Sequence, residues 1–66
     1  MVTKDFADFR YEGEVTNFQL IEKGAAYAYQ NGWPLSVTED SYLLIPMKPE
    51  ETRIGEEVGY LGRKVP

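Results

Sequence analysis

The chain has 66 residues, which places it near the lower size limit for domains that fold alone and allows a single hydrophobic core. It contains no cysteine and no histidine, which excludes disulfides and removes both the commonest zinc ligand and the usual partner of a catalytic nucleophile. Its eleven acidic and seven scattered basic residues give a net charge of −4, which argues against nucleic acid as a partner.

The first third of the sequence predicts short extended segments. Residues 1–8 are expected to be frayed, and residues 5–15 form an extended lead-in whose apolar side chains are irregularly spaced. Residues 15–24 alternate through Phe18 and Leu20 and then reach a charged pair and a glycine, which predicts a strand followed by a turn.

A hairpin is the clearest local feature. Ala26–Gln30 places small residues on one face and tyrosines on the other, as expected for a strand. Asn31 and Gly32 follow, and both tolerate the positive φ angles that a type I′ turn requires. Trp33–Val37 is the predicted return strand, and Pro34 should lie near its start or on a sheet edge, because proline cannot donate a ladder hydrogen bond.

The second half of the chain predicts two further strands separated by a charged loop. After a turn cluster at residues 38–41, Tyr42–Ile45 is a continuous apolar run, which indicates a strand buried on both faces. Prolines end this strand and open the charged loop Lys48–Arg53. Ile54–Arg63 is the predicted final strand, and residues 64–66 are expected to be frayed.

Membrane partners are not expected. The longest apolar run, Tyr42–Met47, is far shorter than the roughly 20 residues that a spanning helix needs. The first five residues do not lead into the apolar stretch of a signal peptide. We therefore expect a cytoplasmic location, with which the absence of cysteine agrees.

Two segments share one pattern. Lys23–Tyr29 and Ile54–Tyr60 both place a glycine before a strand that carries a small residue and then a tyrosine. The small residues, Ala28 and Gly59, would let another backbone or ring approach closely. Together with the strands above, this pattern predicts an all-β fold for residues 1–66, a small barrel or barrel-sandwich-like single domain of about five to seven short strands.

Candidate chemistry is sparse. The densest carboxylate cluster consists of Glu50, Glu51, Glu56 and Glu57, and we interpret it as a solvated acidic loop and turn. A paired-acid site needs carboxylates held in different environments, and neighbouring residues on a strand point to opposite faces. The two serines have no histidine or cysteine to form a nucleophile–base pair. We predict no catalytic residue, no metal ligand and no cofactor in this chain.

The aromatic residues form the other notable set. Most are expected to be core residues or cross-strand pairs, because rings dominate the buried area of small domains. Tyr29 and Trp33 flank the predicted hairpin tip and are the candidate interaction patch.

Three segments also occur in an order that is typical of one enzyme family. They are Thr16–Ala28, which contains Asn17, Phe18 and Gly24; Tyr42–Pro46, an apolar strand that ends at a proline; and Gly55–Gly62, a last strand led by glycine. This order resembles the C-terminal part of the succinylglutamate desuccinylase/aspartoacylase family, and the resemblance covers about Thr16 to Gly62.

The resemblance implies a role beside an enzyme. In that family, zinc-dependent amidohydrolase chemistry belongs to a larger carboxypeptidase-like domain, whose His-x-x-Glu and later His ligands do not occur here. The implied role is a non-catalytic C-terminal β domain that packs on the catalytic domain and shapes substrate access, with zinc held by that other domain. Lys48, Glu50, Glu51 and Arg53 are the candidate substrate-entrance residues, because their loop is charged and follows the predicted buried strand.

The competing hypothesis is a free-standing β-barrel or sandwich module that recognises another protein through its aromatic patch and edge strands. Under both hypotheses the partner is a protein, either a zinc-hydrolase catalytic domain or another protein. Whether the chain works as part of an enzyme stays open at this point.

Overall fold

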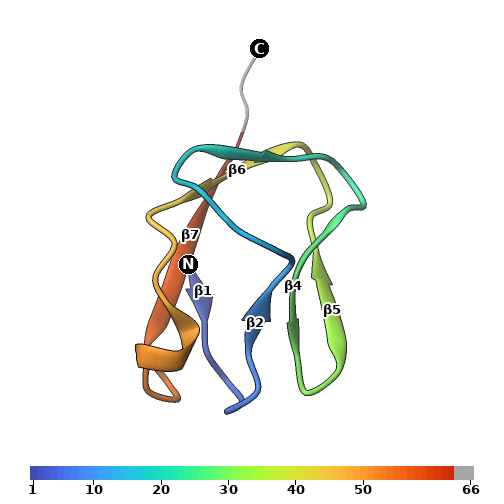
Figure 1. Cartoon of the computed structure of the whole chain (residues 1–66). Coiled ribbons are helices and arrows are strands. Elements are labelled where there is room, and N and C mark those ends of the chain that lie inside the picture. The colour runs from blue at the N-terminus through green and yellow to red at the C-terminus, as the bar shows by residue number, and fades with distance from the viewer. Residues whose placement is uncertain (64–66) are drawn as a thin grey trace.

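The computed structural model describes residues 1–63, and they form seven β-strands and one short 3₁₀ helix (Figure 1). The elements in chain order are β1 (Val2–Thr3), β2 (Arg10–Tyr11), β3 (Gln19–Ile21), β4 (Ala26–Gln30), β5 (Trp33–Ser36), β6 (Ser41–Leu44), η1 (Pro49–Glu51) and β7 (Glu57–Arg63). The predicted all-β fold of five to seven short strands is confirmed. No helix within residues 1–63 has the length and apolar character needed to cross a membrane.

The strands form two antiparallel sheets, which make a small sandwich-like domain that does not close into a barrel. One sheet has the order β1-β7-β6-β3 and the other the order β2-β4-β5. Figure 1 shows β1 and β7 on one side of the molecule and the β4–β5 hairpin on the other. The long strand β7 pairs with β1 along one part of its length and with β6 along another.

The β4–β5 hairpin has the predicted turn. Asn31 and Gly32 have φ angles of 50° and 79°, which are the positive values of a type I′ turn. Pro34 lies in β5, the outer strand of its sheet, where a missing N–H costs no ladder hydrogen bond. The register shifts between Ala26 and Ala28, and this β-bulge explains why Tyr27 and Ala28 are both buried although they are neighbours.

The sequence repeat corresponds to equivalent places in the two sheets. Gly24 and Gly55 precede β4 and β7 with φ angles of 84° and 96°, so both use the left-handed conformation. β4 and β7 each lie inside their sheet, with a paired strand on either side. The small residues Ala28 and Gly59 are both buried, and Gly59 lies directly against the hydroxyl of Tyr11.

One predicted strand differs from expectation. Tyr42–Ile45 is not buried on both faces: Leu43 is fully buried, Tyr42 and Leu44 are half-buried, and Ile45 is 58% exposed. The physical reason is alternation, because Leu43 faces the core while its neighbours lie on the other face of the sheet. Ile45 has left the strand and has a φ angle of 48°.

The core is small and partly aromatic. Its buried apolar residues are Val2, Phe9, Tyr11, Ile21, Tyr27, Ala28, Val37, Leu43 and Val58. The rings of Phe9 and Tyr11 meet edge to face, with centroids 5.3 Å apart and planes at 80°. This is the favourable arrangement of two aromatic quadrupoles.

Residues 1–8, which we expected to be frayed, contribute β1 to the four-stranded sheet. The buried Lys4 ammonium donates hydrogen bonds to the carbonyls of Pro49 (2.7 Å) and Thr52 (2.8 Å), at the two ends of the η1 turn. The buried side-chain amide of Gln30 donates to the carbonyl of Thr3. Its oxygen accepts hydrogen bonds from the backbone N–H groups of Asp5 and Phe6. These contacts fix the segment to both sheets. The other expected frayed segment, residues 64–66, lies outside the described residues.

Candidate functional site

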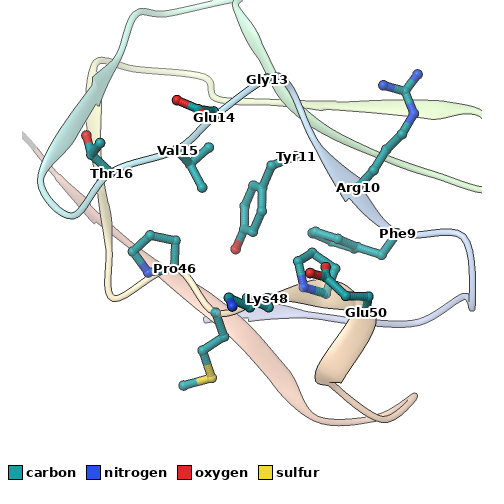
Figure 2. A pocket seen from close by; sticks show the side chains of 12 residues that line it. Phe9, Arg10, Tyr11, Gly13, Glu14, Val15, Thr16, Pro46, Lys48 and Glu50 are labelled. Atoms are coloured by element: carbon teal, nitrogen blue, oxygen red, sulfur yellow. The ribbon is translucent and has the colours of Figure 1, made fainter.

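An open cleft of about 690 Å³ lies between two segments far apart in sequence (Figure 2). One wall comes from residues 9–16, which contain β2 and the chain after it. The other wall comes from residues 46–50, which join β6 to η1. Figure 2 shows the side chains of Tyr11 and Val15 pointing into the cleft opposite Pro46, and Arg10 pointing away from it.

Hydrogen bonds to the sheets hold both walls in place. The backbone N–H of Glu12 donates to the carbonyl of Tyr27 in β4 at 2.9 Å, which extends the pairing of the first wall beyond β2. The N–H of Met47 donates to the carbonyl of Val58 in β7 at 2.8 Å and fixes the second wall. Lys4 then holds the far end of that wall through η1. The cleft is therefore largely preformed, as small binding sites usually are.

Tyr11 forms the floor of the cleft and is not free to act as an acid or base. Its hydroxyl donates a buried hydrogen bond to the carbonyl of Val58. Burial, and secondly the neighbouring Tyr27, raise the pKa of Tyr11 to about 12, and burial also raises the pKa of Tyr27. Both phenols therefore stay protonated and neutral at pH 7.

The edge of β2 that faces away from β4 pairs with no other described strand. β2 is the outer strand of its sheet and pairs only with β4 among the described strands. Because Glu12 directs its N–H towards β4, alternation turns the N–H and C=O of Tyr11 away from β4. An extended segment lying along this side of β2 could exchange hydrogen bonds with them.

The predicted substrate-entrance residues are only partly brought together. Lys48 and Glu50 line the cleft. Glu51 forms an exposed salt bridge with Lys48 at 3.7 Å, one turn along η1. Arg53 does not line the cleft, and its backbone N–H donates to the carboxylate of Glu56 in the following turn. The loop therefore contributes a mixed-charge rim to one wall.

Tyr29 and Trp33 lie on opposite faces of the β4–β5 hairpin. Gln30 pairs directly with Trp33 and Tyr29 with Pro34, and residues directly opposite each other share a face. The centre of the Tyr29 ring lies 4.5 Å from the guanidinium carbon of Arg10. A hydrogen bond with Glu12 raises the pKa of Tyr29. Trp33 is 71% exposed. The two rings do not form one patch.

The cleft residues Tyr11, Val15, Thr16 and Met47 were not identified from the sequence. Nothing in their spacing distinguishes them from other apolar and turn residues, because the cleft depends on the packing of two segments about 30 residues apart in sequence. Within residues 1–63, no group of three or more Asp, Glu, His or Cys side chains is placed to hold a metal ion.

Comparisons with known proteins give no relative for this chain. No protein-family model, no curated protein and no solved structure matches it.

Proposed function

We propose that this chain is a non-catalytic protein-binding domain whose cleft receives an extended segment of another protein. The observation that carries the proposal is the composition of the cleft walls: one wall contains the outer strand β2, and the other is the fixed segment 46–50. Addition of a strand to an exposed sheet edge is a common mode of peptide recognition.

The lining suits a peptide more than a reacting substrate. Tyr11, Val15, Pro46 and Met47 provide an apolar surface beside backbone groups that can pair with a strand. Charged side chains, including Lys48, lie at the rim, where water screens them. Acid–base catalysis needs two titratable groups held in contrasting environments, and the neutral Tyr11 is already committed to a carbonyl.

A narrower form of this proposal follows from the family resemblance. The three similar segments, Thr16–Ala28, Tyr42–Pro46 and Gly55–Gly62, cover β3, the first part of β4, and most of β6 and β7. In this form the partner is the catalytic domain of an aspartoacylase-like zinc amidohydrolase, which would hold the zinc. The rim residues Lys48 and Glu50 would then lie at the substrate entrance. A cytoplasmic location is part of this proposal.

Selection from a phage-displayed library of random peptides, followed by NMR titration of the ¹⁵N-labelled domain, tests the broad proposal. Selected peptides should shift the amide signals of Gly13, Thr16 and Met47. Thr16→Lys, which places a charge in the cleft, should weaken binding at least tenfold, about 1.4 kcal/mol. Thr38→Lys, the same change at an exposed threonine outside the cleft, should have no effect. Peptides that bind equally well to both variants would contradict the cleft as the site.

The narrower form has its own test. The catalytic domain of an aspartoacylase-like enzyme would be assayed on N-acyl amino acids with and without this chain. We expect the added domain to change KM more than kcat, because it shapes access and supplies no reacting group. Equal kinetics in both mixtures would reject the narrower form and leave the broad proposal standing.

A further inference from the structure

Two bulky residues have an unusual backbone conformation. Phe18 and Ile45 have φ angles of 65° and 48°, in the left-handed region that side chains with a Cβ rarely occupy. For a β-branched residue such as Ile45 this conformation is a true outlier. Such strain persists only where the surrounding structure imposes it, and it concentrates at functional positions.

The two residues are neighbours in space. The N–H of Ile45 donates to the side-chain oxygen of Asn17 at 2.8 Å, and the N–H of Phe18 donates to the carbonyl of Leu43 at 2.8 Å. These bonds connect the start of β3 to the end of β6. The result is that Phe18, 68% exposed, and Ile45, 58% exposed, both present apolar side chains to solvent at the same end of the sheet.

The two segments that carry them contain no charged residue. Residues 15–21 and 41–47, which form β3, β6 and their flanks, contain no Asp, Glu, Lys or Arg, although 27% of the chain is charged. Leu20, 41% exposed, pairs with the half-buried Tyr42 beside them. We name the group Phe18, Leu20, Tyr42 and Ile45 the apolar end. Depletion of charge with enrichment of aromatic residues is the composition of the centre of a protein interface.

We infer that the apolar end is the contact between two copies of this chain. Charge indicates where two copies can meet. Each copy has a net charge of −4, so two copies repel each other over most of their surfaces and can meet without like charges in contact only where charge is missing. A basic partner would instead be expected to bind at the acidic surfaces.

The topology and size of the domain agree with this occupant. β3 is the outer strand of the four-stranded sheet, so the apolar end lies at a sheet edge, where a two-fold axis can bring identical patches together. Within residues 1–63, the large side chains that are fully buried are Leu43 and Val58. Domains of this size often gain the stability they need by association. This inference does not depend on ligand binding in the cleft.

Sedimentation equilibrium of the full chain tests the inference from about 10 µM to about 1 mM, the range expected for a small interface. We expect a monomer–dimer equilibrium that strengthens when the salt is raised from about 0.15 M to about 1 M, because salt screens the repulsion between the acidic copies. An association driven by opposite charges would weaken instead. A chain that stays monomeric throughout, or an association that weakens with salt, would overturn the inference.

Substitutions separate an interface role from a structural one. Phe18→Gly removes the ring and the strain together, so it should leave the fold at least as stable while weakening association at least tenfold. Ile45→Gly should act in the same way. Trp33→Ser and Ile54→Ser remove apolar side chains of similar exposure, 71% and 62%, elsewhere on the surface and should leave association unchanged. Equal association of Phe18→Gly and the unmodified chain, or a loss of association in the two serine controls, would contradict the assignment.

Discussion

Gly59→Ala should destabilise the domain because the new methyl group would clash with the buried hydroxyl of Tyr11. A Cβ at this position would lie 2.7 Å from the hydroxyl oxygen of Tyr11, closer than real Cβ contacts allow. The hydroxyl cannot move away without losing its buried hydrogen bond to Val58. Overpacking costs about 1–3 kcal/mol and the lost hydrogen bond about 0.5–1.5 kcal/mol, against about 0.5–1 kcal/mol gained by replacing a strand glycine. The expected net loss is about 1–3 kcal/mol.

Tyr11→Phe should remove most of that loss. Without the phenol oxygen, the next nearest side-chain atom to the new Cβ is the Cδ1 of Leu43 at 3.6 Å, an ordinary contact. The Val58 carbonyl keeps a partner in the N–H of Met47, so Tyr11→Phe alone should cost only about 0.5–1.5 kcal/mol. The double variant should therefore be little less stable than Tyr11→Phe, which gives a coupling energy of about 1–3 kcal/mol.

Urea unfolding followed by far-UV circular dichroism measures the free energy of unfolding of the unmodified chain, the two single variants and the double variant, which together form a double-mutant cycle. Gly62→Ala is the matched control, since its Cβ would meet only the flexible end of Leu44 at 2.9 Å, and its cost should stay below about 1 kcal/mol. The reasoning is refuted if Gly59→Ala costs the same with tyrosine as with phenylalanine at position 11, or if Gly62→Ala costs as much.

Three further predictions concern stability. Lys4→Met should cost about 2–4 kcal/mol in urea unfolding, because it removes two charge-assisted hydrogen bonds to the carbonyls of Pro49 and Thr52; a cost below about 0.5 kcal/mol would contradict this role. Tyr11 binds its proton more tightly when folded, since its pKa is raised to about 12, so its contribution is complete below pH 10 and is lost between pH 10 and 12. A pKa raised by two pH units corresponds to about 2.7 kcal/mol in the free energy of unfolding, which solvent screening reduces to about 1–2 kcal/mol. This loss of stability at high pH should be smaller in Tyr11→Phe. Gly32→Ala should cost about 1 kcal/mol through backbone strain alone, because the position has a φ of 79° and open space around it, and Gly32→Asn should restore part of that loss in thermal unfolding.

Local chemistry explains which parts of the fold could be predicted. The strand Ala26–Gln30, the Asn31-Gly32 turn and the return strand follow from alternation and from the φ preferences of two residues, all within one short segment. The placement of Tyr29 and Trp33 on opposite faces was also available from the sequence. In a two-residue hairpin, Gln30 faces Trp33, so the residue before Gln30 must point the other way.

The remaining features depend on contacts that no local pattern encodes. Ile45 ends an apolar run that is typical of a buried strand, and an Asn17 side chain 28 residues away stabilises its left-handed conformation. In the sequence Lys4 is one of several scattered basic residues, and it is buried because carbonyls 45 and 48 residues away accept its hydrogen bonds. The cleft likewise requires both sheets to be formed before its walls face each other.

The pairing of β1 with β7 also has a consequence for synthesis on the ribosome. Val2 lies opposite Gly59, so Val2 cannot pair until the segment around Gly59, 57 residues later, has emerged from the ribosome. The β4–β5 hairpin needs only neighbouring residues and can form much earlier. We therefore expect the domain to close only after β7 has emerged from the ribosome, with the β4–β5 hairpin formed before that point.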